Sequence, residues 1–244
     1  MARRWLAVVF AMVGSLAQAG DAAPTPSVIH LASEEWEDYT AADGHGLGWD
    51  VMRAIFEPVG VKVDFRTEPY TRAVGLAQRG EVDACVGSYR DEVSEVLYPR
   101  WNFDTDHIYA LGLASNPAPN PKTLGSYRLA WVRGYEFQKY LPNVQRYNEV
   151  VRRTGILSML THNRADYYID ALTEIDYVLK RAKDPSQFRR THVAELPLYL
   201  CFADNPKARA LMALFDQRMD LLVKNGTLKP IFERWKQPYP FDAN

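Results

Sequence analysis

The feature that most constrains the fold is an alternation of strand-like and helix-like segments in the first part of the chain. Three short apolar runs have the character of buried strands, and the two segments between them show helical spacing of apolar side chains. In chain order these segments are residues 28–32, 48–58, 61–65, 70–78 and 82–86. The pattern strand–helix–strand–helix–strand predicts an α/β fold with a parallel sheet and right-handed crossovers. Such sheets bind ligands beyond the carboxyl ends of their strands.

The alternation changes near residue 107 and then resumes. Residues 107–114 form an apolar run that leads into a proline-rich linker, and residues 196–203 form a second extended run. Between them we expect strands at 128–132, 145–151 and 166–169 and helices at 136–140, 155–162 and 172–181. Two half-size α/β units joined by two extended crossovers would make a protein with a cleft. The two units share an architecture without a close sequence repeat.

The C-terminal segment, residues 215–235, reads as an amphipathic helix, a stop and a second short helix. Asn225-Gly226 predicts a left-handed helix end, and Thr227 is a candidate N-cap for a helix at 228–235. A helix pair of this kind covers a core and carries no catalytic chemistry of its own.

This helix pair resembles the C-terminus of bacterial extracellular solute-binding proteins of family 3, the polar amino-acid binders of ABC importers. The consensus sequence of the family in this region is close to "L…dGtl.kI..kW". Residues 47–50 (Leu-Gly-Trp-Asp) resemble the family's "G.D", and residues 78–84 and 162–166 resemble "L..GkvDa" and "L..gRvDa". Asn163 replaces the glycine of the last motif, and Asn also tolerates a left-handed cap. In order and spacing, these motifs cover essentially the whole mature chain.

The resemblance implies a two-lobed periplasmic binding protein-like fold of type II, with two α/β lobes, two crossover strands and a ligand cleft. Lobe 1 would comprise residues 28–112 and 198–244, and lobe 2 residues 113–197. The implied function is capture of a small polar ligand, an amino acid or related carboxylate, for delivery to a membrane ABC permease. The lobes would close around it in the manner of a Venus flytrap.

The N-terminus has the pattern of a secretory signal peptide. Two arginines precede an apolar run at residues 5–16, which is too short to span a bilayer comfortably, and residues 17–19 (Ala-Gln-Ala) form a small-x-small cleavage site. We expect cleavage after Ala19, a disordered leader at 20–27 and export to the periplasm.

The charge composition limits the classes of partner that we expect the protein to bind. Lys+Arg 29 against Asp+Glu 30 gives a net charge of −1, so nothing favours nucleic acid or an anionic membrane surface. We expect a monomer without membrane insertion. The two cysteines, Cys85 and Cys201, lie in strand-like runs; they either pair in an oxidising periplasm or stay buried as thiols. No zinc spacing is present, and we expect no metal and no cofactor.

The candidate ligand-binding residues of lobe 1 begin after the first and second strands. Trp36 and Tyr39 lie on an acidic loop and could cover a cationic or apolar part of a ligand; the alternative is a solvated loop. Residues 69–73 resemble the family's "PW.RA", so that Tyr70 would flank the ligand. Arg72 could hold a carboxylate, but an ordinary first-turn residue facing solvent is the preferred interpretation.

The third strand leads into the remaining lobe 1 candidates. Here the family has "T.eR", whose arginine clamps the α-carboxylate of the ligand. In this chain Ser94 takes that place, and Arg90 comes earlier. We expect Arg90 to act as the main cation, because a guanidinium has a long reach, with support from Ser88 and Tyr89. Otherwise the ligand is not a standard α-amino acid.

In lobe 2, the turn after residue 132 and the strand end near residue 170 are the candidates. The family's "rGs/t" matches a turn containing Gly134, where Tyr135 replaces a hydroxyl residue and free backbone N–H groups could receive an anion. Asp170 is a candidate partner for an ammonium group, although the family's acid falls one place later, at Ala171. Asp170 could instead N-cap the following helix.

Two alternatives use the same fold. A periplasmic dehydratase similar to cyclohexadienyl dehydratase would need a general acid, plausibly a Glu or His in the cleft. His45, His107, His162 and His192 are candidates, but no G-x-S-x-G, H-E-x-x-H or phosphate-binding loop is present. A secreted protein that presents its ligand to a membrane sensor would share the binding chemistry. We therefore expect a non-enzymatic binding protein without catalytic residues.

Overall fold

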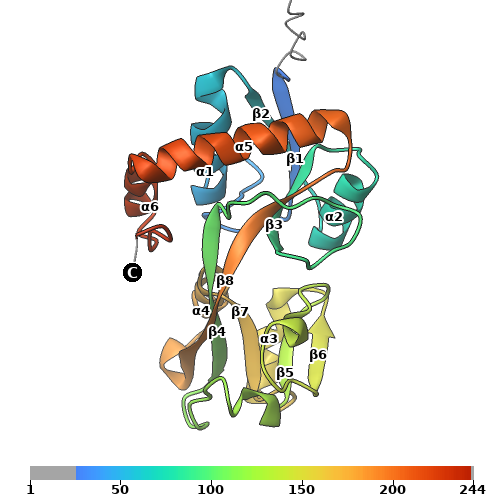
Figure 1. Ribbon diagram of the computed structural model, residues 1–244. Helices are drawn as coiled ribbons and strands as arrows, with labels where there is room; N and C mark the ends of the chain where they lie inside the picture. The colour runs from blue at the N-terminus through green and yellow to red at the C-terminus, as the bar shows by residue number, and fades with distance from the viewer. Residues whose placement is uncertain (1–25, 243–244) are drawn as a thin grey trace, which may run out of the picture.

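The structure is a computed structural model that describes residues 26–242. The expected signal peptide and nearly all of the expected leader lie outside the described residues. No helix among the described residues is both long and apolar enough to cross a membrane. The strands follow one another in the sheet order β2-β1-β3-β8-β4-β7-β5-β6, and Figure 1 shows an upper and a lower half joined by β4 and β8.

The upper half begins with the predicted alternation. Its elements are β1 (Val28–Ser33), α1 (Leu47–Phe56), β2 (Lys62–Thr67), α2 (Tyr70–Gln78) and β3 (Ala84–Tyr89). β1 pairs in parallel with both β2 and β3, as the sequence pattern predicts. α1 buries an apolar face that includes Trp49, whose ring stacks on Phe65 with centroids 4.3 Å apart.

Two long strands connect the halves. β4 (Asp104–Leu113) and β8 (Phe188–Phe202) run antiparallel along their length, with a bulge between Ile108 and Tyr109. β8 then pairs with β3, and β4 pairs with β7, so each crossover strand belongs to both halves. Both strands begin earlier in the chain than their apolar runs indicate, because their first residues are polar or charged.

The lower half contains the second α/β set. Its elements are β5 (Leu129–Val132), β6 (Tyr147–Val150), α3 (Ile156–Thr161), β7 (Tyr167–Ala171) and α4 (Leu172–Leu179). β5 pairs in parallel with β6 and with β7. The helix expected at 136–140 is only a 3-10 turn at Phe137–Lys139, preceded by Glu136 in a left-handed conformation with φ 47°. The 3-10 segments are Glu57–Val59, Leu124–Ser126, Phe137–Lys139, Arg153–Gly155 and Pro185–Gln187.

The two aspartates of the "vDa"-like motifs have matching roles. Asp83 accepts a hydrogen bond from the backbone N–H of His30 at 2.7 Å, and Asp166 accepts one from the backbone N–H of Arg128, also at 2.7 Å. Each carboxylate thus ties its own strand to the start of the first strand of its half. Asn163 has φ 55°, the left-handed conformation expected of a glycine replacement.

The C-terminal helices, α5 (Pro206–Lys224) and α6 (Lys229–Arg234), pack on the upper half beside α1 (Figure 1). Gly226 has φ 70°, as expected for a left-handed helix end. The predicted N-cap is wrong: Leu228 occupies the N-cap position, and the hydroxyl of Thr227 donates instead to the side-chain oxygen of Asn225. The side chain of Asn225 thus satisfies Thr227 before α6 begins.

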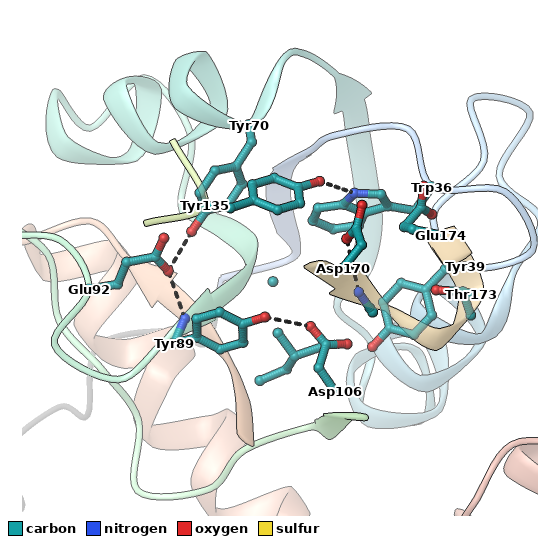
Figure 2. Close-up of a pocket in the computed structure, with 13 residues that line it drawn as sticks. Trp36, Tyr39, Tyr70, Tyr89, Glu92, Asp106, Tyr135, Asp170, Thr173 and Glu174 are labelled. Carbon is teal, nitrogen blue, oxygen red and sulfur yellow. Dashed lines mark hydrogen bonds between the residues drawn. The ribbon is translucent and has the colours of Figure 1, made fainter. Parts of the chain in front are cut away.

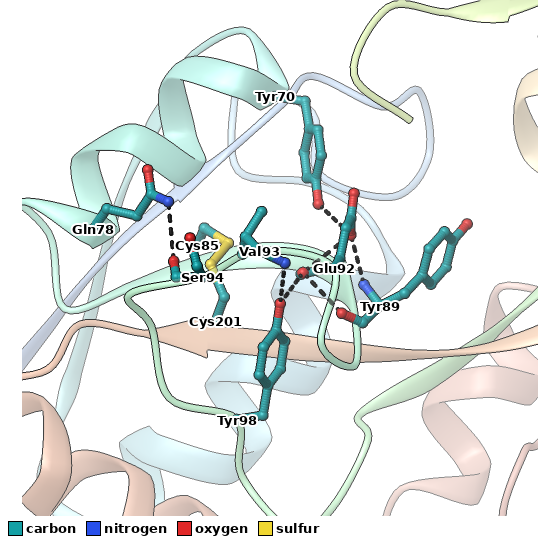
Figure 3. The surroundings of a disulfide bond; sticks show 10 residues. Tyr70, Gln78, Cys85, Tyr89, Glu92, Val93, Ser94, Tyr98 and Cys201 are labelled. Carbon is teal, nitrogen blue, oxygen red and sulfur yellow. Dashed lines mark hydrogen bonds between the residues drawn. A yellow bond between two sulfur atoms is a disulfide. The ribbon is translucent and has the colours of Figure 1, made fainter. Parts of the chain in front are cut away.

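The cysteines form a disulfide. Cys85 in β3 and Cys201 in β8 are directly opposite in the antiparallel register, with Cα atoms 5.0 Å apart (Figure 3). Of the two alternatives left open by the sequence, the structure has the bridge. It fixes the returning crossover strand to the first half.

Candidate functional site

A pocket of about 500 Å³, a volume that includes its open mouth, lies between the two halves. Figure 2 shows the side chains that point into it. Its lining comes from the loop after β1, the start of α2, the end of β3, the start of β4, the turn after β5 and the junction of β7 with α4. The lining residues are Trp36, Tyr39, Tyr70, Gly87, Tyr89, Glu92, Asp106, Tyr135, Asp170, Ala171, Thr173, Glu174 and Leu198.

The structure brings together most of the residues predicted to bind ligand. Those that line the pocket are Trp36, Tyr39, Tyr70, Tyr89, Tyr135 and Asp170. They follow several different strands, and the sheet places the ends of those strands at one cleft. Parallel-strand geometry therefore accounts for their convergence.

The aromatic side chains are in mutual contact across the cleft. The ring centroid of Trp36 lies 6.2 Å from that of Tyr39 and 6.4 Å from that of Tyr70, and Tyr70 and Tyr135 meet edge to face at 5.8 Å. Trp36 Nε1 donates a hydrogen bond to the Tyr135 hydroxyl at 2.9 Å, which joins the two halves. Burial raises the pKa of Tyr39, Tyr70 and Tyr135 well above the ordinary value, so these phenols keep their protons.

The two predicted cations do not reach the pocket. Arg90 is exposed; its Nη2 donates to the carbonyl of Pro99 at 2.7 Å, and its guanidinium lies 4.3 Å from the ring centroid of Tyr199. Arg72 pairs with Glu68 at 3.2 Å with its side chain 66% exposed, which matches the preferred interpretation of a solvent-facing helix residue. The shift of the loop that would bring Arg90 to a ligand is not present.

The other two predicted residues lie behind or beside the lining. Ser88 is buried, and its hydroxyl oxygen lies 3.1 Å from both the backbone oxygen of Tyr89 and the carboxylate of Glu92, to which its single proton can be donated. Gly134 has φ 88°, and its N–H donates to the carboxylate of Glu149 at 3.2 Å. The backbone N–H of Gly134 is therefore already occupied by an acid of this chain.

Several acidic lining residues were missed by sequence reasoning. Glu92 is buried and accepts hydrogen bonds from the Tyr70 hydroxyl at 2.7 Å and from the backbone N–H of Tyr89 at 2.9 Å. Its desolvation raises its pKa. Glu92 lies two places after Arg90, and nothing in the local sequence distinguishes it from a surface acid.

A second missed group lies at the start of β4. Asp106 accepts from the Tyr89 hydroxyl at 2.9 Å, and Asp104 accepts from the Tyr39 hydroxyl at 2.7 Å. Desolvation raises the pKa of Asp106 to about 8, with a further contribution from Asp104, whose own pKa desolvation raises to about 7. The sequence signal was available: two acids with a spacing of two lie on one face of a strand, directly before an apolar run.

Arg153 is a cation in contact with two acids of the pocket lining, Asp170 and Glu174, and it was also missed. Its Nε lies 3.0 Å from Asp170 and 2.9 Å from Glu174, and its Nη1 lies 3.3 Å from Glu34. Its Nη2 donates to the hydroxyl of Tyr135. Burial opposes the charge of Arg153, but its acidic neighbours, Asp170 first, hold its pKa above the ordinary value.

Asp170 does not cap a helix in the way that the alternative interpretation supposed. α4 begins at Leu172 with Ala171 in the N-cap position. One carboxylate oxygen of Asp170 accepts from the backbone N–H of Ala171 at 2.9 Å, and the other accepts from Arg153 and from the hydroxyl of Tyr168. Asp170 thus anchors Arg153 at the wall of the pocket.

One cluster among residues 26–242 has the donor set of a metal site. His107 on β4 and His192 and Glu195 on β8 place their ligand atoms within 4.8 Å of one another. This cluster lies on the crossover strands and does not line the pocket between the halves.

No protein-family model matches the chain. Among curated proteins it is similar to the "Probable amino-acid-binding protein YxeM" of Bacillus subtilis, with 21% identity over 200 residues that cover 78% of this chain and 75% of that protein.

Solved structures share the fold. A histidine kinase sensor domain with similarity to periplasmic binding proteins matches with a TM-score of 0.70 and 17% identity, over 86% of this chain and 96% of that chain. The substrate-binding protein of an amino acid ABC transporter matches with a TM-score of 0.67 and 18% identity, over 86% and 100%. AncCDT-1, an ancestral amino-acid-binding protein described as a precursor of cyclohexadienyl dehydratase, matches with a TM-score of 0.65 and 16% identity, over 86% and 95%. The chain therefore has the two-lobed periplasmic binding protein-like fold that its motifs predict, and its resemblance to amino-acid-binding proteins is confirmed.

Proposed function

We propose that this protein is a periplasmic solute-binding protein that captures a small polar ligand between its two lobes for delivery to an ABC importer. The observation that carries the proposal is the pocket itself, which is lined from both halves and lies where β4 and β8 connect them. Pockets of a few hundred Å³ with aromatic walls and a few polar groups are typical of small-molecule sites. The similarity to amino-acid-binding proteins supports the same conclusion.

The lobes, residues 28–112 with 198–244 and residues 113–197, would close by a hinge motion in β4 and β8. Contacts between the loop after β1 and the second lobe support a closed state. They are the Trp36–Tyr135 hydrogen bond and the Arg153–Glu34, Lys180–Asp38 and Arg181–Glu37 ion pairs at 3.3, 3.7 and 3.9 Å. The Lys180–Asp38 and Arg181–Glu37 pairs are exposed and contribute little energy. The cost of opening would therefore come mainly from the more buried Arg153–Glu34 pair and the Trp36–Tyr135 hydrogen bond.

A thermal-shift screen of amino acids, amines and organic acids tests the proposal. A ligand that binds only the folded protein stabilises it by RT ln(1+[L]/Kd), about 2.7 kcal/mol at a hundredfold excess over Kd. Small-angle scattering should show a smaller radius of gyration with the same ligand. If no compound raises the melting temperature and the radius never changes, the binding function is wrong.

Export and partners follow from the same proposal. Residues 1–19 would act as a signal peptide cleaved after Ala19, and the mature monomer would meet a membrane permease in the periplasm. Mass spectrometry of protein purified from the periplasm would test the cleavage position.

An enzyme of the cyclohexadienyl dehydratase type is a second candidate. The likeness to AncCDT-1 favours it, and so does Glu174, a buried pocket acid whose pKa desolvation raises, so that it could hold a proton. The other carboxylates that line the pocket oppose an acidic substrate such as prephenate. We therefore favour a protein without catalytic activity, and an assay for prephenate turnover would decide.

A ligand-presenting partner of a membrane sensor is the remaining alternative. The likeness to a histidine kinase sensor domain favours this possibility. Such a protein would bind its ligand in the same pocket, and co-purification with a permease or with a sensor kinase would separate the two roles.

A further inference from the structure

We propose that the ligand of this pocket is a small organic cation without a carboxylate group, such as an amine or a guanidine, held by carboxylates inside an aromatic cage. This inference rests on the proposed solute-binding function and specifies its ligand. It departs from the expectation of an amino acid or related carboxylate.

The lining of the pocket carries an excess of acidic groups. Glu92, Asp106, Asp170 and Glu174 contribute to its wall, and no lysine, arginine or histidine among residues 26–242 does so. A carboxylate ligand would enter beside four acidic groups and would meet no basic partner in the lining. A cation would instead favour the charged forms of these acids, which burial alone disfavours.

Arg153 does not supply the missing positive charge. Its guanidinium is shared among Asp170, Glu174 and Glu34, and its remaining nitrogen donates to Tyr135. With only 11% of its side chain exposed, it is committed to these partners. An incoming carboxylate would have to displace buried charge pairs, which is costly.

The two other places that could receive a carboxylate are blocked. Arg90 faces away from the cleft and donates to the carbonyl of Pro99. The N-terminus of α4 faces the pocket, but Asp170 precedes it and Glu174 lies in its first turn. These two acids already complement the positive end of the helix dipole.

One acid of the pocket wall, Glu174, has a buried carboxylate oxygen that receives no hydrogen bond. Glu174 is 4% exposed, and its Oε1 has no hydrogen-bond partner, although its other oxygen pairs with Arg153. A buried acceptor left unpaired costs free energy. An ammonium or guanidinium N–H would satisfy this oxygen and favour the ionised form of Glu174. A quaternary ammonium group has no N–H to donate.

The aromatic side chains suit the same ligand. Trp36, Tyr39, Tyr70, Tyr89 and Tyr135 surround the space in Figure 2. Ring faces attract cations, and desolvation strengthens the attraction. An aromatic cage interrupted by carboxylates therefore selects for positive charge over an apolar group.

Matched pairs of compounds test the proposal by calorimetry. Each pair is an amino acid and its decarboxylated product: arginine with agmatine, ornithine with putrescine, and lysine with cadaverine. We expect at least one amine to bind ten times more tightly than its parent, because the carboxylate alone distinguishes them. Tetramethylammonium, which has no N–H, should bind more weakly than the best amine.

Two substitutions test whether the pocket acids account for the binding of amines. Asp106→Asn removes one charge while retaining an oxygen for the Tyr89 hydroxyl, and Glu174→Gln removes another; each should weaken amine binding at least tenfold. Asp64→Asn is the matched control, because Asp64 is exposed on β2 and pairs with His30. It should leave affinity unchanged.

The possible outcomes separate the two proposals. Tighter binding of the amino acids than of their amines would overturn the cation inference and leave the solute-binding function standing. Unchanged amine affinity in folded Asp106→Asn and Glu174→Gln would also overturn it. Failure of every compound to bind would contradict both.

Discussion

At the scale of single residues, the pocket repeats one arrangement, a buried phenol that donates to a carboxylate. Tyr39 donates to Asp104, Tyr70 to Glu92 and Tyr89 to Asp106, at 2.7, 2.7 and 2.9 Å. Each hydrogen bond fixes a ring and an acid together, so the aromatic and anionic walls are positioned as a unit. The three tyrosines could be predicted because aromatic residues at strand ends stand out. Asp104 and Asp106 carry a local signal, their spacing of two on a strand, but Glu92 has none, because its partner Tyr70 is distant in sequence.

Gly134 offers a test of lobe closure. A Cβ added there would lie 2.5 Å from Thr71 Cγ2 on α2 of the opposite lobe. We expect Gly134→Ala to hold the lobes apart and to weaken ligand binding tenfold or more, measured by calorimetry. Thr71→Ala in the same chain should restore most of the affinity, because it removes the opposing methyl group.

Gly60 provides the matched control for that experiment. Gly60 has φ 82° and Gly134 has φ 88°, so alanine is strained by about 1–2 kcal/mol at either position. No atom lies within 4 Å of a Cβ at Gly60. Both variants should lose similar stability in urea, but Gly60→Ala should bind normally. Equal affinities in the two variants would contradict the closure argument.

At the scale of elements, periodicity predicted most helices and strands, and α2 has the predicted bounds, Tyr70–Gln78. The two main failures have different causes, one local and one tertiary. The turn at Phe137–Lys139 follows a left-handed Glu136, and β8 extends back to Phe188 through polar and charged residues that no apolar run marks. Such residues adopt a strand because β4 pairs with them, which is a tertiary cause.

The disulfide between β3 and β8 gives a prediction at this scale. It joins residues separated by 116 positions, so it restricts the unfolded chain strongly. Replacing Cys85 and Cys201 together by alanine should lower the free energy of unfolding by about 2–4 kcal/mol in urea titrations. Wild-type protein unfolded with a reductant should match the variant. A double variant as stable as the oxidised protein would show that the bridge adds nothing.

At the scale of the whole molecule, closure collects carboxylates from both lobes, and this makes stability depend on pH. Desolvation raises the pKa of Asp106 to about 8 and that of Asp104 to about 7, against about 3.9 in an unfolded chain. Between the unfolded pKa of about 3.9 and the folded values of about 7 and 8, the folded protein binds more protons than the unfolded chain. Its stability therefore falls as pH rises through this range. We expect the melting temperature of the ligand-free protein to decrease from pH 5 to pH 8.5.

The same measurement has internal controls. Asp106 faces Tyr89, Asp104, Asp170 and Glu92, and Asp106→Asn should flatten the decrease. Surface carboxylates such as Asp166, whose pKa the Arg128 hydrogen bond lowers, titrate below this window. A bound amine favours the charged carboxylates, so its stabilising effect should grow with pH. A melting temperature that rises from pH 5 to pH 8.5 would contradict this account.

The sequence by itself determined the α/β class, the two crossovers and the aromatic residues of the cleft, because apolar period and strand-end position are local properties. It left open the cysteine pairing and misplaced the cation of the site. Only the tertiary structure decided that Arg90 turns outward, that Arg153 is enclosed by three acids and that Glu92, Asp106 and Glu174 share one pocket. The physical reason is that the charge of a cleft is a sum over side chains from many strands, and no short stretch of sequence contains that sum.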